Sequence, residues 1–362
     1  SWSLDKLDIG VGTATLTAKG TLDLKGVASA THFTVDVNIP DTSALGALNG
    51  DRLREQSFTF NGRVTGGNGE LQVEGLTAAL GESKVQGDIY YRASDVPKLD
   101  ARISADFLEL ATLIEDREEE PAEDVDKDVG ASPEDGDDRV IPDIEIPLEA
   151  MASLNANLEI EIGELPRGNI QVRDVNVSAT MQDGTLDLSD FSFLARSGAL
   201  AARGKIEPRG GVGGASLELV ARDLALGINP ANQDLATTSD IDIKLESTGT
   251  SLRSLAGNAD GVVYLASEGG RVANSRAVQF LFGSVVREIL SAVNPFSTDK
   301  PYTNFECMIV PVEINAGILE TNPSLLVATD QVRIVAKSRI NLKTEKVEIN
   351  VRTTPKKGIS LS

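Results

Sequence analysis

The rest of the chain is organised around Thr250-Ser-Leu-Arg-Ser-Leu-Ala-Gly-Asn-Ala-Asp-Gly-Val-Val-Tyr-Leu-Ala-Ser-Glu-Gly-Gly-Arg271 and the amphipathic segment 274–293 that follows it. In that segment apolar residues recur at intervals of three and four, which lays one apolar stripe along a helix. Asn294-Pro295 ends the pattern, because proline lacks an amide hydrogen. We predict one helix over 275–293, packed on a long sheet through Val278, Leu281, Phe282, Val285, Ile289 and Val293.

The sequence on both sides of this helix alternates between apolar and polar residues, as β-strands do. In 33–39, for example, Phe33, Val35, Val37 and Ile39 alternate with Thr34, Asp36 and Asn38. Such a strand places one face in an apolar layer and the other in water. The chain is therefore predicted to be mainly β, with sheets that are apolar on one face.

The strand pattern also repeats. Asn68-Gly69-Glu-Leu-Gln-Val matches Asp183-Gly184-Thr-Leu-Asp-Leu, and Gly87-Asp-Ile89 matches Gly204-Lys-Ile206 in the same order. A weaker third version follows Gly317. Repetition at nearly fixed spacing means that each unit relies on stacked neighbours to bury its apolar face, so we expect an elongated body.

An acidic segment interrupts the strand pattern. Residues 115–143 hold few apolar side chains, and we predict a disordered linker between a first β region, 1–114, and a second, 144–362. Asp124, Asp126 and Asp128 have the spacing of a calcium loop, but Val129 stands where the turn glycine belongs. We therefore favour a solvated linker over a metal site.

Composition excludes several classes of function. The formal net charge of −21 repels nucleic acid, so no nucleic-acid partner is expected. With one histidine and one cysteine the chain has no Ser-His-Asp triad, no Cys-His pair and no usual zinc site. His32 lies on the polar side of its strand, and Cys307 is expected to be buried because it alternates with Phe305 and Ile309. We expect no enzyme and no cofactor.

The long apolar face has too few helices to cover it. Either the sheet folds over into a closed core, or lipid covers the face. Acyl chains gain ~0.8 kcal/mol per buried methylene, and an open side leaves the headgroup hydrated. The predicted groove lining is Phe33, Val35, Val37, Ile39, Leu71, Val73, Leu186, Leu188, Leu217, Leu219, Ile241, Ile243, Leu245, Val347, Ile349 and Val351.

The last strands are basic although the whole chain is acidic. Their cations either solvate the strand face and discourage edge pairing, or meet a lipid headgroup or membrane. The candidate contacts are Arg333, Lys337, Arg339, Lys343, Lys356 and Lys357.

Several stretches together resemble the AsmA family, repeating β-groove proteins of the Gram-negative envelope that also include TamB and YhdP. They are Asn155-Ala-Asn-Leu-Glu-Ile, the Asp183-Gly-Thr-Leu turn, the Leu-Ala-Gly-Asn element within 249–261, Glu268-Gly-Gly-Arg-Val, and Phe305-Glu-Cys followed by Asn315-Ala-Gly-Ile. Each is a weak turn pattern by itself, but the combination is fairly specific.

The resemblance implies an elongated, twisted antiparallel sheet that forms an open, taco-like groove. It also implies a periplasmic protein, tethered to the inner membrane by an N-terminal helix absent from this chain, that carries phospholipid or another acyl lipid toward the outer membrane. Its expected partners are an envelope membrane or a membrane protein. The alternative is a scaffold or assembly factor for outer-membrane proteins that acts through strand edges. The acidic segment and the missing anchor depart from the family pattern.

Overall fold

The fold is described from a computed structural model, which covers residues 2–22, 31–45, 47–48, 51–52, 55–109, 139–167, 170–226, 237–273, 302–329 and 332–356. The predicted helix 275–293, with its stripe from Val278 to Val293, lies outside these residues, as does the calcium-like spacing Asp124 to Asp128. The described chain is mainly β. Nineteen strands are assigned to one mostly antiparallel sheet, which confirms the predicted fold class, and a two-stranded hairpin stands apart. The chain divides into unit 1, Ser1–Arg139 with Glu149–Ser189, and unit 2, Val140–Leu148 with Asp190–Ser362.

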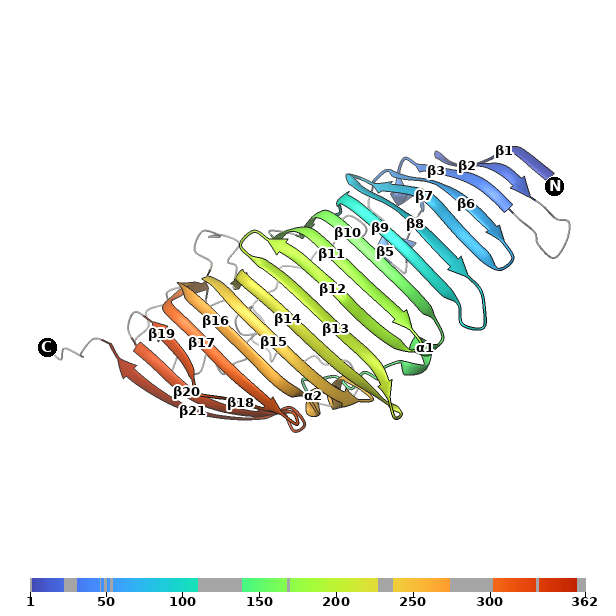
Figure 1. Ribbon diagram of the computed structural model, residues 1–362. Coiled ribbons are helices and arrows are strands. Elements are labelled where there is room, and N and C mark those ends of the chain that lie inside the picture. The colour runs from blue at the N-terminus through green and yellow to red at the C-terminus, as the bar shows by residue number, and fades with distance from the viewer. Residues whose placement is uncertain are drawn as a thin grey trace. The chain divides into compact units, whose positions relative to one another are not determined.

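Unit 1 contains a ladder of neighbouring strands whose order follows the sequence (Figure 1). Its elements are β1 (Trp2–Val11), β2 (Ala14–Leu22), β3 (Thr31–Ile39), the 3-10 helix η1 (Thr42–Leu45), the small hairpin β4 (Ala47–Leu48) and β5 (Asp51–Arg52), β6 (Phe58–Gly67), β7 (Glu70–Leu80), β8 (Ser83–Arg92), β9 (Lys98–Phe107), β10 (Asn155–Arg167) and β11 (Ile170–Gln182). β12 (Thr185–Ala195) and helix α1 (Leu148–Ala152) cross the division between the units.

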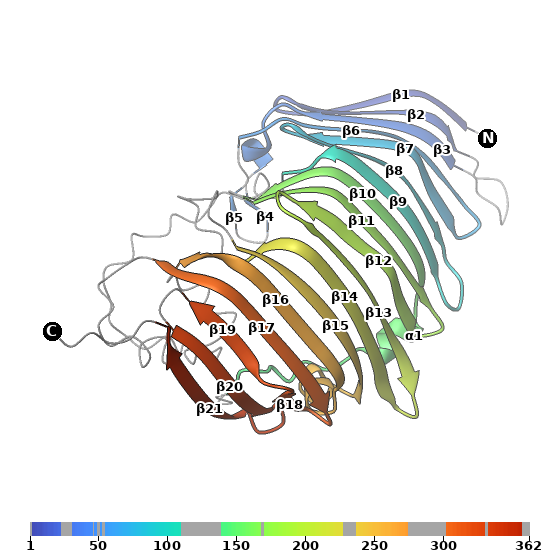
Figure 2. The ribbon, with the colours of Figure 1, turned by 60° about the vertical axis from the view of Figure 1, so that its left-hand side comes forward.

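Unit 2 continues in the same manner. It contains β13 (Ala199–Arg209), β14 (Val212–Leu226), β15 (Thr237–Gly249), helix α2 (Leu252–Gly257), β16 (Asp260–Ala273), β17 (Tyr302–Asn315), β18 (Ile318–Thr321), β19 (Leu325–Thr329), β20 (Val332–Asn341) and β21 (Lys346–Pro355). β13 to β17 pair in sequence order, β18 and β19 both lie between β17 and β20, and β21 pairs with β20 (Figure 2).

Three hairpins of the repeat turn through two residues with positive φ, the conformation that matches the twist of the flanking strands. These turns are Asn68-Gly69 (φ 54° and 77°), Asp183-Gly184 (51° and 78°) and Ala316-Gly317 (48° and 76°). Glycine, asparagine and aspartate tolerate this region better than other residues do. The repeated turn pattern in the sequence therefore marks the same local structure three times.

One strand pair departs from the antiparallel expectation. β10 runs parallel to β9, with Ala101 opposite Leu158 and Ala105 opposite Ile162. Parallel neighbours cannot be joined by a tight turn and need a connection of a dozen residues or more. The chain between Phe107 and Asn155, which includes the acidic segment, supplies that connection. The acidic residues therefore fall in the connection between the two strands that pair in parallel in the described part of unit 1.

Helices α1 and α2 were not predicted, because five and six residues are too short to show an apolar period. α2 nevertheless carries a start signal. The hydroxyl of Ser251 accepts a hydrogen bond from the backbone amide of Ser254, and Ser254 accepts one in return from the amide of Ser251. This reciprocal capping satisfies amides that a helix N-terminus otherwise leaves unpaired.

Candidate functional site

The candidate site is the apolar face of the sheet, which the strand registers define residue by residue. Residues opposite each other in neighbouring strands point to the same side, so one row can be followed across unit 1. The row passes through Ile9, Leu16, Val37, Phe60, Ala78, Val85, Ala105, Ile162 and Val175. Nine strands therefore present an apolar residue at the same level, and their polar residues point to the other side.

Unit 2 has an apolar face of the same kind. One row runs through Gly204, Leu217, Leu245, Gly261, Ile314, Leu319, Ile340 and Val347. Gly261 interrupts this row because its backbone lies so close to β15 that an added Cβ would be 2.0 Å from the carbonyl oxygen of Lys244. Glycine is needed there for the close approach of two strands.

Several of the predicted lining residues lie on this face, as the strand registers show. Phe33 is opposite Val64, which is opposite Val73, and Leu219 is opposite Ile243. Ile349 is opposite Ser338 and Val351 is opposite Ala336. Leu186 and Leu188 lie two residues apart in β12 and therefore share one of its faces. Their role as a lipid lining stays a prediction.

In the described part of unit 1 the apolar face is partly exposed. Along β3 the apolar positions are half-buried and the alternating polar positions are exposed. Leu7, Ile9 and Leu71 are 43%, 48% and 44% exposed. A closed core would leave such side chains almost no contact with water, because interiors are packed as densely as organic crystals. The apolar face of unit 1 therefore has accessible aliphatic surface.

Unit 2 covers one end of its apolar face with its own chain. We call Val140–Leu148 the strap. Its amides at Val140 and Ile141 donate to the carboxylate of Glu345, at 2.7 and 3.0 Å. The amide of Ile146 donates to the carbonyl of Thr250 at 2.8 Å, beside α2.

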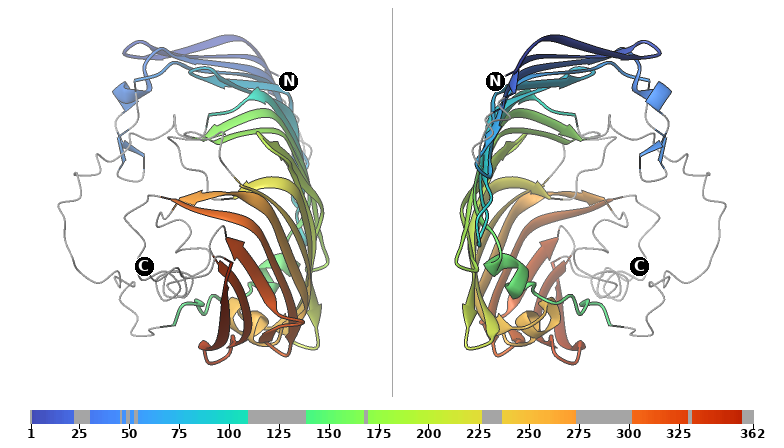
Figure 3. Two further views of the ribbon diagram at one scale, coloured as in Figure 1. Left: turned by 90° about the vertical axis from the view of Figure 1, so that its left-hand side faces the viewer. Right: turned by 90° about the vertical axis from the view of Figure 1, so that its right-hand side faces the viewer.

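Helix α2 lies on the same side as the strap and inside the bend of the unit 2 strands (Figure 3). A Cβ added at Gly249 would be 2.3 Å from the hydroxyl of Ser254 in α2, and one added at Gly213 would be 3.0 Å from Ile146 of the strap. Gly213 and Gly249 are directly paired and share the face of Leu217 and Leu245. The strap and α2 therefore close one strand end of the unit 2 apolar face.

The predicted cations do not gather at the mouth of this face. Arg333, Lys337 and Arg339 alternate with Ile334 and Ala336 in β20 and so point to the opposite, polar face. Lys343 packs against Gly257 of α2, and Lys356 forms an ion pair with Glu306. Lys357 lies outside the described residues. A contact between these cations and a headgroup bound on the apolar face is therefore not supported, whereas contact with a separate surface stays a prediction.

A comparison with family models supplies the decisive observation. The model of the AsmA family matches residues 17–324, which is most of the chain. The chain belongs to the AsmA family. The resemblance inferred from the sequence motifs is thereby confirmed. No curated protein and no solved structure matches the chain.

The motifs that suggested the AsmA family have defined places in the fold. Asn155-Ala-Asn-Leu-Glu-Ile opens β10, the strand that pairs in parallel with β9. The Gly249–Gly261 element forms α2 and the start of β16, with Gly249 under the helix and Gly261 against β15. Two of the resembling stretches therefore lie at the parallel strand pair and at the end of the unit 2 apolar face that α2 covers.

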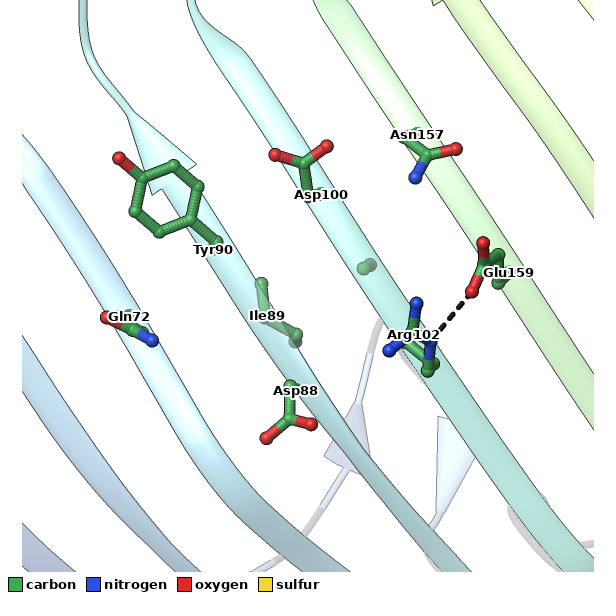
Figure 4. Close-up of a pocket in the computed structure, with 9 residues that line it drawn as sticks. Gln72, Asp88, Ile89, Tyr90, Asp100, Arg102, Asn157 and Glu159 are labelled. Atoms are coloured by element: carbon green, nitrogen blue, oxygen red, sulfur yellow. Dashed lines mark hydrogen bonds and ion pairs between the residues drawn. The ribbon is translucent and has the colours of Figure 1, made fainter.

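The polar face of this AsmA-family chain carries a shallow hollow of about 160 Å³ over β7 to β10 (Figure 4). Arg102 donates to Glu159 at 2.7 Å, and this carboxylate raises the pKa of Arg102. Arg92 lies 5.5 Å from the ring centroid of Tyr90. Such contacts between exposed side chains contribute little to stability. The hollow is part of the exposed polar face of the sheet.

Other chemistry is sparse in the described part of the chain. It contains no group of three histidine, cysteine, aspartate or glutamate side chains suited to a metal. None of its helices has the length and apolar character of a membrane span. His32 is exposed on the polar face, as predicted, with Nδ1 3.2 Å from the hydroxyl of Thr65. Cys307 is only half-buried rather than fully buried, because its position in β17 is opposite Glu268 on the polar face.

Proposed function

We propose that this chain carries phospholipid acyl chains on its apolar face, as a non-enzymatic lipid carrier between the inner and outer membranes. Membership of the AsmA family supports an envelope protein. The observation that carries the proposal is the apolar face of unit 1, where nine strands align aliphatic and aromatic residues, most of which stay partly exposed. Acyl chains are the natural complement of a long, smooth surface without polar groups.

The energetics favour a bound acyl chain. A methylene gains ~0.8 kcal/mol on leaving water, so a chain of ~16 carbons gains on the order of 12 kcal/mol before ordering costs. The charged headgroup cannot be buried in the same way. Burial of its charge without a partner would cost far more than the chain gains, so it must stay in water at the open side. A half-covered sheet meets both requirements, whereas a sealed cavity meets only the first.

The proposal is tested by mass spectrometry of organic extracts from protein purified without detergent. The informative variant is Val35→Asp, which places a charge on the apolar face of β3 at a half-buried position. The matched control is Thr34→Asp, which adds the same charge to the same strand on its exposed polar face. We expect co-purifying phospholipid in the wild type and in the control, and a several-fold loss in Val35→Asp. Lipid-free wild-type protein would contradict the proposal.

The alternative function is assembly of outer-membrane proteins by strand addition. Within the described residues β1 pairs only with β2, and β21 only with β20, so each offers an edge for such a contact. Crosslinking separates the two functions. Lipid photoprobes should label the apolar face if the chain carries lipid, whereas contacts of an assembly factor should collect at β1 and β21.

A further inference from the structure

The edge strand β21 is exposed along almost its whole length. Nine of its ten residues are exposed, and in the part of the chain that the structure describes it hydrogen-bonds to β20 alone. It lies at the margin of the unit 2 sheet (Figure 2). A strand in this position presents a row of backbone N–H and C=O groups that another strand can pair with.

The apolar side chains of β21 lack the cover that their neighbours have. On β20, which has strands on both sides, Ile334 and Ala336 are 2% and 1% exposed. On β21, Val347 and Val351 belong to the same face but are 48% and 38% exposed. One more strand beside β21 would cover them laterally in the same way.

β21 also lacks one device that protects many edges, a β-bulge, although it carries Lys346, Arg352 and Pro355. It pairs with β20 through ten successive residues without a register shift, so no bulge turns it away from a partner. At the other end of the chain, β1 has an irregularity between Leu4 and Leu7 in its pairing with β2. Bulges of that kind protect an edge from further pairing. The two outer strands are therefore not equivalent.

Among the described residues, Glu348, Arg352 and Lys346 of β21 form no ion pair, and the first two have opposite charges. Glu348 lies opposite Arg339, but Arg339 is engaged with Glu320 at 2.8 Å. Arg352 lies opposite Val335, which offers no charge. Neither Glu348 nor Arg352 forms an ion pair within the described residues. A strand beside the free edge could give each of these two side chains an ion-pair partner of opposite charge.

We propose that two copies of this chain pair antiparallel through β21, with Asn350 on the twofold axis. In this register Glu348 faces Arg352 of the second copy, and the reverse pair follows from symmetry. Ile349 faces Val351 of the second copy on the apolar side. The strand is therefore complementary to itself in both charge and hydrophobicity.

Other registers of the β21 pair give less favourable contacts. A shift that centres the pair on Ile349 brings Lys346 opposite Arg352, which is repulsive, and centring on Val351 leaves Arg352 opposite Asn350. Registers in which the twofold axis falls between two residues place the apolar side chains of the two copies on opposite sides of the sheet. Only the register centred on Asn350 satisfies both charges.

The twofold axis stands perpendicular to the sheet in such a pair, so the apolar faces of the two copies lie on the same side. The pairing depends only on β21 and not on what the apolar face binds. A failure of the dimer therefore leaves the lipid proposal intact, and the reverse also holds.

Engineered cysteines test the register directly, in a Cys307→Ser background. Opposite residues of antiparallel strands have Cα atoms about 4.5 to 5.5 Å apart, which a disulfide can span. Asn350→Cys should give a disulfide dimer on mild oxidation. Lys346→Cys and Thr354→Cys should each stay monomeric alone, since like positions would lie about 27 Å apart, but should crosslink when mixed.

The result that overturns the proposal is equally specific. Absence of the mixed Lys346→Cys and Thr354→Cys crosslink, or equal dimer yield from Ser3→Cys on β1, would exclude this pairing. Sedimentation of the untreated wild type should show a concentration-dependent dimer. A wild type that stays monomeric overturns the proposal and leaves the β21 edge available to a different protein.

A charge exchange provides a second, independent test. Glu348→Arg and Arg352→Glu should each weaken the dimer on the order of tenfold, because each creates two like-charged contacts. The double variant should restore wild-type dimerisation. Glu82→Arg, in the exposed turn between β7 and β8, is the control that should change nothing. Equal loss in the single and double variants would contradict the proposed contact.

Discussion

Unit 1 and unit 2 present apolar faces of the same design but bury them to different extents. Among the described residues of the unit 1 face, Ala105 and Val175 are buried, and the larger side chains are half-buried or exposed. On the unit 2 face, Ala221, Ile314 and Ile334 are all 5% exposed or less. The same alternation of residues therefore gives an open surface in one unit and a partly closed one in the other.

The difference shows that alternation decides which residues share a face, and that other features decide whether the face is covered. In unit 2 the strap and α2 cover one strand end, and β18 and β19 together flank β20. In unit 1 the described elements outside the ladder are η1, the β4–β5 hairpin and α1 near the Asp183-Gly184 turn, and the larger side chains of the face stay half-buried or exposed beside them. We expect unit 1 to contribute more of the ligand-binding surface and unit 2 more of the stability.

The largest expected effect contrasts one apolar position from each unit. Ile334→Asp would bury a charge at a site that is 2% exposed, and should lower the free energy of unfolding by about 4 kcal/mol or more. Val35→Asp, at a half-buried site, should cost much less because its carboxylate can reach water. Chemical denaturation followed by circular dichroism measures both. Similar losses would mean that the unit 1 face is a closed core.

The strap offers the second test. In Glu345→Ala the amides of Val140 and Ile141 lose their acceptor, so we expect a loss of about 1–3 kcal/mol in unfolding free energy and faster proteolysis within the strap. The control is Glu82→Ala, which removes an exposed carboxylate from the turn between β7 and β8. If proteolysis of the strap is equally slow in both variants, the strap is not held by Glu345.

Substitutions in the repeated turns should change stability by smaller amounts and in opposite directions. Gly184→Ala in unit 1 forces a residue with a side chain to φ 78° and should destabilise by about 1–2 kcal/mol. Ala316→Gly in unit 2 relieves the same conformation at φ 48° and should stabilise by up to about 1 kcal/mol. Thermal melts of the two variants should shift in opposite directions. Shifts of the same sign would contradict a shared turn geometry.

The smallest effect is common to both units and concerns their polar faces. Hydrogen bonds from Lys6 and then Thr17 lower the pKa of Asp8 in unit 1, and those from Lys205 and then Arg209 lower the pKa of Glu207 in unit 2. A carboxylate with a lowered pKa stabilises the fold above its unfolded-state pKa, and this contribution is lost as pH falls through the folded-state pKa. NMR titration should show both groups titrating below ordinary carboxyls, and salt should weaken the effect.

The features that sequence predicted correctly are local. Asn68-Gly69 and Asp183-Gly184 predict their turns because only a few residue types adopt positive φ readily. The alternation of 33–39 predicts a two-sided strand because side chains of a strand point alternately to opposite faces. Family membership was also recognisable, since such turns recur in a fixed order.

The features that sequence did not predict depend on distant parts of the chain. Nothing in β9 or β10 alone shows that they pair in parallel, because either strand could have paired in the other direction. The strap could not be predicted from sequence for a similar reason. Its contacts with Glu345 come from backbone amides, which every residue type except proline provides. The signal that would have found α2 is the Ser251 and Ser254 pair, three residues apart.

The order of strands in unit 1 has a consequence for how the protein is made. From β1 to β9 nearly every strand pairs with one that precedes it closely in sequence, so each hairpin can form as it leaves the ribosome. The parallel joint at β10 is the exception, because loop closure over the crossover must come first. A ladder built this way lengthens by adding hairpins at its growing end, whereas the strands that follow β10 can join it only after the crossover has closed.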